Sequence, residues 1–134
     1  MKTFLDSGVL LIAWRGREAE AALGVMEDPR RQFYTSQLVK LELLPKAAFF
    51  KQEAEIEFYQ THFRAAKGEE PLSRELGEKA AELAHQHGLA AVDALHLAAA
   101  IRQGADEFIT AEKPGKPMFR VRDISVKSLH TQSV

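Results

Sequence analysis

Polar residues at the ends of predicted strands are the first candidates for chemistry in this chain. Asp6 ends a short apolar run, and Thr110 ends the strand predicted over 106–110. Binding sites in open parallel α/β folds form beyond the carboxyl ends of the strands, so both positions carry weight. Ser7 and Gly8 then open a predicted helix, where glycine permits close backbone approach and the helix amides face an anion. Taken alone, however, an acid in front of a helix is more often an N-cap.

Two further acids lie on predicted helices. Glu42 interrupts the apolar stretch 38–44, so its carboxylate is expected against or near the core, which is costly unless a cation or a donor meets it. The simpler alternative is an exposed pair with Lys46, one helical turn later. Asp93 lies in the first turn of the helix predicted over 92–103, where the helix macrodipole favours its ionised form. Acids are common at helix starts, so Asp93 alone does not identify a site.

The histidines add little by themselves. His96 follows Asp93 by three residues and shares its helix face, so it could orient that acid or touch a substrate. A packed, hydrogen-bonded histidine is the more ordinary interpretation. His85 and His87 are two residues apart on a helix and point in different directions, so we expect surface residues rather than a metal pair.

Composition limits the class of protein. The chain has 134 residues, of which 46% are hydrophobic, and this predicts a single domain over 1–134. The absence of cysteine excludes disulfides, thiolate zinc sites and cysteine nucleophiles, so a metal would be held by carboxylates or histidines. No apolar run is long enough for a membrane span, and Asp6 comes too early for a secretory signal. We therefore expect a cytoplasmic protein with no membrane association.

The charge distribution restricts how the chain could hold nucleic acid. A formal net charge of −1 argues against binding over the whole surface, since that mode neutralises many phosphates. Any contact must be local, and the segment after position 112 is basic, whereas 53–82 is acidic. The basic residues nearest the predicted site edge are Arg15, Arg17, Lys113, Lys116 and Arg120.

Strands and helices alternate along the chain. Such alternation predicts an α/β fold with a mostly parallel central sheet covered by helices on both faces. The proline at position 45 should kink or end the first part of its helix. Strands are predicted at 3–6, 32–35, 106–110 and 123–129, with a very short one at 71–73; helices are predicted from 9, at 18–26, from the N-cap Ser36 to 44, and at 52–66, 74–87 and 92–103.

Four segments in this order form a recognisable set. They are Leu5-Asp6-Ser7-Gly8-Val9-Leu10, then Ser36 to Glu42, then Val92-Asp93-Ala94-Leu95-His96-Leu97-Ala98, and finally Ala105 to Lys113. Together they resemble PIN domains, with the strongest likeness to VapC-like toxins, over nearly the whole chain. The run Asp-Ala-Leu-His-Leu-Ala, followed by a strand ending in Thr-x-acid, is the most specific part. The resemblance implies a three-layer α/β/α sandwich.

The same resemblance implies roles for individual residues. It makes Asp6, Glu42 and Asp93 metal-binding acids and Glu112 the fourth acid, at a position where family members usually have aspartate. Converging carboxylates repel one another unless cations neutralise them, and oxygen ligands suit Mg²⁺ or Mn²⁺. We therefore expect hydrolysis of RNA phosphodiesters, in which Asp6 and Asp93 hold the principal ion and Glu42 and Glu112 complete the site. The remaining site residues, Thr110 and Ser7, would orient water or phosphate.

The resemblance also implies partners and leaves alternatives. A VapC-like toxin is expected to bind a small VapB-like antitoxin and to form a homodimer. A housekeeping RNA-processing nuclease and a non-catalytic PIN-like module that binds RNA or protein remain open. A receiver or aspartyl phosphatase is disfavoured because the first motif lacks the paired acid of a D-x-D nucleophile. Common nucleotide-binding glycine motifs are also missing from the sequence.

Overall fold

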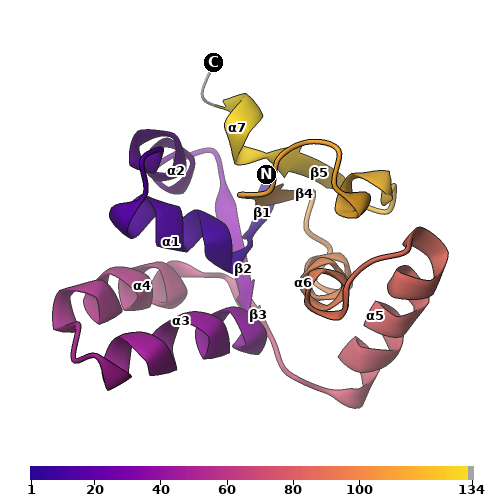
Figure 1. The fold of residues 1–134 in the computed structure, drawn as a ribbon, viewed down its shortest axis with the longest axis horizontal. Helices are drawn as coiled ribbons and strands as arrows, with labels where there is room; N and C mark the ends of the chain where they lie inside the picture. Colours follow the sequence, from indigo (N-terminus) through magenta and orange to yellow (C-terminus); the bar gives the residue numbers. More distant parts are fainter. Residues whose placement is uncertain (133–134) are drawn as a thin grey trace.

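A parallel five-stranded sheet forms the centre of the molecule (Figure 1). The structure is a computed structural model that describes residues 1–132, with side chains described as far as residue 130. The strand order is β3-β2-β1-β4-β5, and every neighbouring pair is parallel, which confirms the predicted sheet type. The strands are β1 (Lys2–Leu5), β2 (Gln32–Ser36), β3 (Gly68–Glu70), β4 (Glu107–Thr110) and β5 (Ser125–Ser128).

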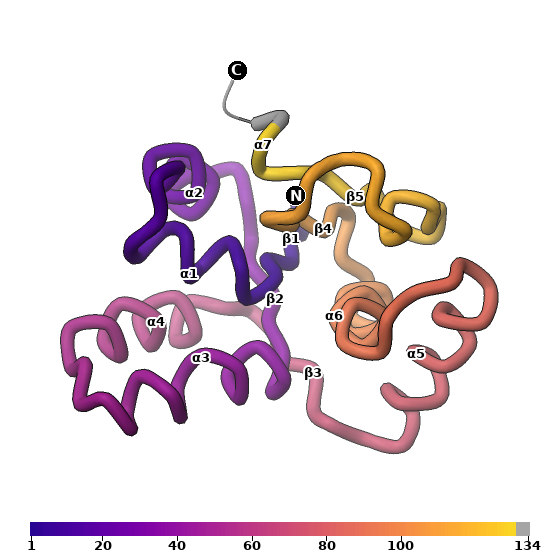
Figure 2. The backbone as a smooth tube through the Cα atoms, in the orientation of Figure 1, coloured from indigo at the N-terminus to yellow at the C-terminus, as the bar shows by residue number. Residues whose placement is uncertain are grey.

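Helices cover both faces of this sheet. Helices α1 to α4 lie on one side of the sheet, and α5 and α6 lie on the other (Figures 1 and 2). The three-layer α/β/α arrangement is therefore confirmed. Within residues 1–132, every helix is too short or too polar to span a bilayer. The helices are α1 (Ser7–Arg15), α2 (Ala19–Met26), α3 (Gln37–Phe49), α4 (Glu53–Ala65), α5 (Arg74–His87), α6 (Ala91–Arg102) and α7 (Leu129–Gln132), with a 3₁₀ turn η1 (Pro117–Arg120).

Local capping explains where several helices begin and end. The Ser36 hydroxyl accepts a hydrogen bond from the Val39 amide at 3.1 Å, and Ser73 does the same for Leu76 at 3.1 Å. Each bond satisfies one of the amides that a helix start leaves without a partner. Gly88 ends α5 with a φ of 67°, a left-handed conformation that glycine adopts without steric cost. The predicted start of α3 and both predicted bounds of α5 therefore have a local physical cause.

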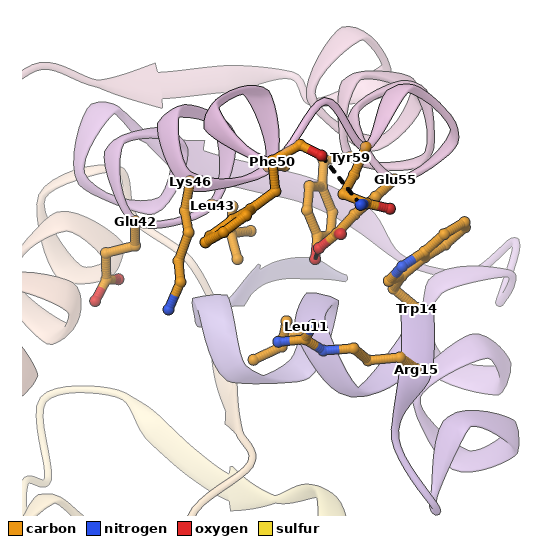
Figure 3. A pocket seen from close by; sticks show the side chains of 11 residues that line it. Leu11, Trp14, Arg15, Glu42, Leu43, Lys46, Phe50, Glu55 and Tyr59 are labelled. Carbon is orange, nitrogen blue, oxygen red and sulfur yellow. Dashed lines mark hydrogen bonds between the residues drawn. The ribbon is translucent and has the colours of Figure 1, made fainter.

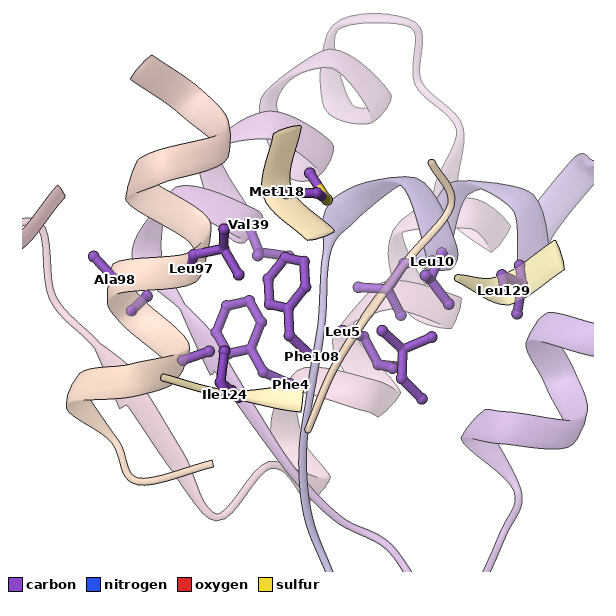
Figure 4. Close-up of a cluster of buried hydrophobic side chains, with 14 of the residues drawn as sticks. Phe4, Leu5, Leu10, Val39, Leu97, Ala98, Phe108, Met118, Ile124 and Leu129 are labelled. Carbon is purple, nitrogen blue, oxygen red and sulfur yellow. The ribbon is translucent and has the colours of Figure 1, made fainter. Parts of the chain in front are cut away.

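The core lies between the sheet and the two helix layers (Figure 4). Phe4 of β1 and Phe108 of β4 are fully buried, and their rings stack with centroids 5.6 Å apart. Leu97 of α6 and Val39 of α3 are also fully buried. This packing fixes the relative positions of the two central strands, whose carboxyl ends carry the candidate site.

The prediction of a short strand at 71–73 is wrong, because β3 is formed by Gly68–Glu70 instead. Gly68 pairs with Tyr34 of β2, and a Cβ atom added at Gly68 would lie 3.0 Å from the Tyr34 ring. The edge strand thus begins at a residue where a side chain would crowd the Tyr34 ring, which its polar sequence does not reveal. Pro71 has no amide hydrogen to continue the ladder, so the strand ends before it.

Pro45, predicted to kink or end the first part of its helix, does not end it, because α3 continues to Phe49. Proline cannot donate to the carbonyl of Leu41, four residues earlier. Leu41 and Pro45 both lie on the exposed side of α3, where water can replace the missing donor. The helix tolerates the proline because the lost bond faces solvent rather than the core.

Candidate active site

The candidate site lies where the chain connections change sides of the sheet. Strand β1 pairs with β2 on one side and with β4 on the other. The connections from β1 through β2 to β3 run through α1 to α4 on one face of the sheet, whereas the connection from β3 to β4 runs through α5 and α6 on the other face. A crevice beyond the carboxyl ends of the strands is expected at such a switch point. Leu5 is in register with Ile109, and the Asp6 amide donates to the Ile109 carbonyl at 3.1 Å. Asp6 and Thr110 therefore lie side by side at this edge.

Asp6 is an almost buried carboxylate held by several donors. Its Oδ1 accepts from the Val9 amide at 3.1 Å, so Asp6 is indeed the N-cap of α1. Burial raises the pKa of Asp6 above its usual value, although hydrogen bonds from the Thr110 side chain and the Ala111 backbone oppose this effect, as does the nearby His96. The net increase means that the charge of Asp6 is not fully compensated by the protein. Asp6 would bind a cation favourably.

Gly8 permits a close approach of the chain, as the sequence predicted. A Cβ atom at this position would lie 3.0 Å from the Ala111 Cβ atom and 3.4 Å from Oδ1 of Asp6. The glycine therefore allows the loop after β4 to approach the first turn of α1. Helix α1 begins at Ser7, so Gly8 lies in its first turn, directly after the N-cap Asp6.

Glu42 reaches the site from α3, where it forms polar contacts with two other helices. Its Oε1 accepts a hydrogen bond from the Ser7 hydroxyl at 2.8 Å and lies 2.6 Å from Nε2 of His96. The hydrogen bond to His96 lowers the pKa of Glu42, and Ser7 adds to the effect. Glu42 is more exposed than expected, and no ion pair with Lys46 is present among residues 1–132. Ser7 and His96 therefore hydrogen-bond the Glu42 carboxylate, and such partners are what an acid near the core was expected to need.

Asp93 lies half-buried in the first turn of α6, where the charges of neighbouring acids affect its pKa. Burial raises its pKa most, and the negative charges of Glu112 and Glu42 raise it further, while His96 and Lys116 lower it. Repulsion of this kind requires the three carboxylates to be neighbours. Helices α3 and α6 and the loop after β4 thus place their acids around the carboxyl ends of β1 and β4.

The loop that carries Glu112 is fixed by its backbone. The Glu112 amide donates to the Thr110 hydroxyl at 3.0 Å, and its carbonyl accepts from the Ser128 hydroxyl at 2.7 Å. Nε2 of His130 lies 2.9 Å from the Ala111 carbonyl. Thr110 is fully buried, so its hydroxyl supports Asp6 and this loop rather than facing solvent. The Glu112 side chain itself is exposed.

The donor chemistry of these residues fits a hard divalent cation. Carboxylate oxygens are the ligands that Mg²⁺ and Mn²⁺ prefer, and the pKa values of Asp6 and Asp93 are raised as expected for acids with too little positive charge nearby. Within residues 1–132, however, no three acid or histidine side chains surround a single point closely enough to be metal ligands. Side-chain rotation of Asp93 or Glu112 would be needed to complete such a set.

Two supporting residues were missed or undervalued. His96 is buried and hydrogen-bonded, as its more ordinary interpretation predicted, but its partner is Glu42 and not Asp93. Its place on the same helix face as Asp93 was the signal available. Ser128 fixes the Glu112 loop from β5, and no sequence signal marks that role.

The basic candidates differ in their surroundings. Lys116 is close enough to Asp93 to lower its pKa, so it lies at the site. Arg15 lines a cavity that also contains Glu42. Arg120 donates to the His87 carbonyl at 3.1 Å. The other two, Arg17 and Lys113, are exposed.

A model of the PIN domain matches residues 3–113, which include all four acids. The chain belongs to the PIN-domain family. PIN domains are generally nucleases, so the crevice described above lies on the fold of a nuclease. Among curated proteins, none matches the chain by sequence.

Solved structures share the fold over almost the full length of the chain. VapBC2 from Rickettsia felis, bound to a DNA fragment from its promoter, has a TM-score of 0.70 at 17% identity and covers 96% of this chain and 98% of its own. VapBC-1 from nontypeable Haemophilus influenzae has a TM-score of 0.69 at 18% identity, and the match covers 97% of this chain and 99% of the other. A toxin–antitoxin complex from Klebsiella pneumoniae has a TM-score of 0.64 at 21% identity, and the match covers 92% of this chain and 98% of the other. At these identities the likeness is one of fold.

Proposed function

We propose that this PIN domain is a Mg²⁺- or Mn²⁺-dependent endoribonuclease and the toxin of a type II toxin–antitoxin pair. The observation that supports the activity best is the raised pKa of Asp93, caused by burial and by Glu112 and Glu42. Acids kept this close without neutralisation are typical of sites that function with a cation bound. The toxin assignment rests on the fold shared with the VapBC complexes.

In this proposal the side chains divide the work between binding and positioning. Asp6 and Asp93 hold the principal ion, and Glu42 and Glu112 complete its surroundings. A bound divalent ion would polarise the scissile phosphate and lower the pKa of the attacking water. The Ser7 hydroxyl donates to one Glu42 oxygen and would help to orient water or phosphate beside that acid. Thr110 supports Asp6 from within the protein.

His96 acts in this proposal as a positioning residue. Its Nε2 fixes Glu42, and its other ring nitrogen, Nδ1, is buried without a hydrogen-bond partner among the described residues. Replacing His96 with glutamine, which keeps a donor, should reduce cleavage about tenfold, whereas leucine should reduce it about a hundredfold, as for residues that support metal ligands. Single-turnover RNA cleavage measures both values. Equal loss in the two variants would mean that His96 only fills space.

The central experiment is a cleavage assay with purified protein and mixed structured RNAs. We expect cleavage with Mg²⁺ or Mn²⁺ and none in EDTA or in the Asp93→Asn variant. Glu75→Gln is the matched control, because Glu75 is an exposed acid in the first turn of α5, as Asp93 is in the first turn of α6. Cleavage that survives both EDTA and Asp93→Asn would refute the mechanism. A folded protein that binds RNA without cleaving it would instead identify a non-catalytic PIN-like module.

The partners are tested separately. A short gene encoded immediately upstream should yield a protein that co-purifies with this chain and blocks cleavage, whereas a housekeeping nuclease would lack such a partner. The chain alone is expected to form a homodimer, which light scattering would measure. Exposed apolar side chains on α3, after β3 and at the start of α6 provide apolar surface for association: Leu41, Leu72 and Val92.

A further inference from the structure

A cavity of about 460 Å³ opens beside the candidate site, between α1 on one side and α3 and α4 on the other (Figure 3). Its volume falls within the range of roughly 300–1,000 Å³ that small-molecule pockets occupy. Glu42 belongs both to its wall and to the acid cluster, so the cavity is continuous with the place where a phosphodiester would be cut. The residues that line the cavity include Trp14, Arg15, Lys46, Phe50, Glu55 and Tyr59.

The floor of the cavity combines apolar surface with a carboxyl group. Tyr59 is fully buried and Glu55 nearly so, and the Tyr59 hydroxyl donates to Oε2 of Glu55 at 2.5 Å. Burial raises the pKa of Tyr59, so this hydroxyl remains a donor. Oε1 of Glu55 accepts no hydrogen bond from any described residue. The floor therefore offers an acceptor to a ligand that brings its own N–H donors.

The rim is cationic and aromatic. Arg15 and Lys46 are exposed, and neither side chain forms an ion pair or hydrogen bond within residues 1–132. Figure 3 shows Lys46 between Glu42 and Phe50 on α3, with Arg15 opposite on α1. Trp14 and Phe50 are 36% and 57% exposed, so each leaves surface on which a base could stack. The Trp14 ring also packs against Phe58, with the centroids 5.5 Å apart. Cations at the rim and an acceptor at the floor give the cavity a defined polarity.

We infer that this cavity binds the nucleotide adjoining the scissile bond, with a guanine base against Glu55 and its phosphate at Lys46 and Arg15. The inference rests on the proposed function and adds a base preference to it. Guanine presents two neighbouring N–H donors on its Watson–Crick edge, which a carboxylate can accept together. Aromatic side chains stack on bases of unpaired RNA, and cations bind phosphate. Glu55 would repel a phosphate at the floor, which fixes the orientation.

A nucleotide fits this pattern better than an apolar segment of a protein. A hydrophobic side chain would leave Glu55 buried without a donor for Oε1, which costs free energy. It would also leave Lys46 and Arg15 without an anion. A guanine nucleotide provides a partner for each of these groups.

Trp14 makes the inference measurable without catalysis, because it is the single tryptophan of the chain. Guanosine 5′-monophosphate is titrated in EDTA while Trp14 emission is followed, and free N-acetyltryptophanamide corrects for light absorbed by the nucleotide. We expect a saturable change, with uridine 5′-monophosphate binding about tenfold more weakly because it offers fewer donors to Glu55. The Trp14→Phe variant should abolish the signal.

Variants locate the binding. Glu55→Gln should weaken binding of the nucleotide about tenfold, since it removes a charged acceptor. Lys46→Ala should weaken binding of the monophosphate but leave guanosine, which lacks phosphate, unchanged. Glu57→Gln is the control, because Glu57 is exposed on the same helix and pairs with Arg64. Thermal melting checks that Glu55→Gln folds. Because Lys46 is exposed, Lys46→Ala tests the site without disturbing the core.

The outcomes separate this inference from the proposed nuclease. No saturable change with the monophosphate, or equal binding in the Glu55, Lys46 and Glu57 variants, overturns the inference. A peptide of the upstream-encoded protein that alters Trp14 emission where the nucleotide does not would make the cavity a protein-binding surface and also overturn it. RNA cleavage without guanine binding leaves the nuclease intact and rejects only the base site. Guanine binding with the expected variant pattern but no cleavage supports the site and rejects the nuclease.

Discussion

Replacing Asp6 with asparagine should reduce RNA cleavage on the order of a thousandfold, because a metal ligand at the reacting phosphate stabilises the transition state by several kcal/mol. The same change should make the metal-free protein more stable at neutral pH. Burial raises the pKa of Asp6 above the 3.8 of an ordinary aspartate, so its charged form destabilises the folded state. Asparagine removes that charge and still accepts the hydrogen bond from Val9.

The dependence on pH gives this prediction a distinct signature. Since the pKa of Asp6 is higher in the folded than in the unfolded protein, its unfavourable contribution is complete above the folded pKa and disappears as the pH falls through it. The stability advantage of the asparagine variant should therefore shrink in acid. Urea unfolding in EDTA over a series of pH values measures this stability difference. Asp6→Ala is the comparison, because it also removes the side chain that caps α1. An asparagine variant less stable than the wild type at neutral pH would contradict the argument.

Magnesium should distinguish the same two proteins. A ligand that binds only the folded state raises the unfolding temperature. Adding Mg²⁺ should therefore stabilise the wild type and have a much smaller effect on Asp6→Asn. This readout needs no substrate, so it separates loss of cation binding from loss of RNA binding.

The sequence was most informative where a local signal coincides with the fold. Ser36 and Gly88 mark helix ends by their own conformational preferences, and the structure confirms both. The positions of Asp6 and Thr110 followed from one rule, that parallel strands place their carboxyl ends at one edge. These features depend on a few neighbouring residues, so they can be predicted without knowing the rest of the structure.

Features that depend on distant partners could not be predicted in this way. Gly68 starts an edge strand that pairs with Tyr34, whose ring would crowd a side chain at this position, and the two residues are far apart in the sequence. His96 could not be assigned to Glu42 before α3 and α6 were placed together. Glu107 is a further case, since an acid in a strand predicts nothing about the cations that surround it in the fold.

A second large effect is expected on stability, at the Glu107 carboxylate. Glu107 lies at the end of β4 opposite the site. Its side chain is 1% exposed and is met by Arg31 at 2.8 Å, Lys127 at 2.7 Å and the Thr3 hydroxyl at 2.5 Å. Burial alone would raise the pKa of Glu107, but its hydrogen bonds with Arg31, Lys127 and Thr3 outweigh burial and lower it. The network thus keeps a charge inside the protein, next to the central strand β1.

Replacing Arg31 with methionine should cost about 3 kcal/mol of unfolding free energy at neutral pH, because a buried carboxylate then loses its main partner. Because the folded pKa of Glu107 lies below its ordinary 4.5, the stabilisation is present above that value and is lost as the pH falls through the folded pKa. The difference in unfolding free energy between the wild type and Arg31→Met should therefore become smaller at acidic pH. Urea unfolding of both proteins at neutral and acidic pH provides the measurement.

Two further variants decide whether the buried charge is the cause. Arg30→Met removes the neighbouring arginine, whose side chain is 88% exposed, and should change stability little. The double variant Arg31→Met/Glu107→Gln removes the charge together with its partner and should recover part of the loss. If Arg31→Met were no more costly than Arg30→Met, the buried carboxylate would not depend on Arg31. If the double variant recovered nothing, the loss in Arg31→Met would come from packing of the arginine stem. Partial recovery that fades in acid would show that Arg31 stabilises the fold through the ionised form of Glu107.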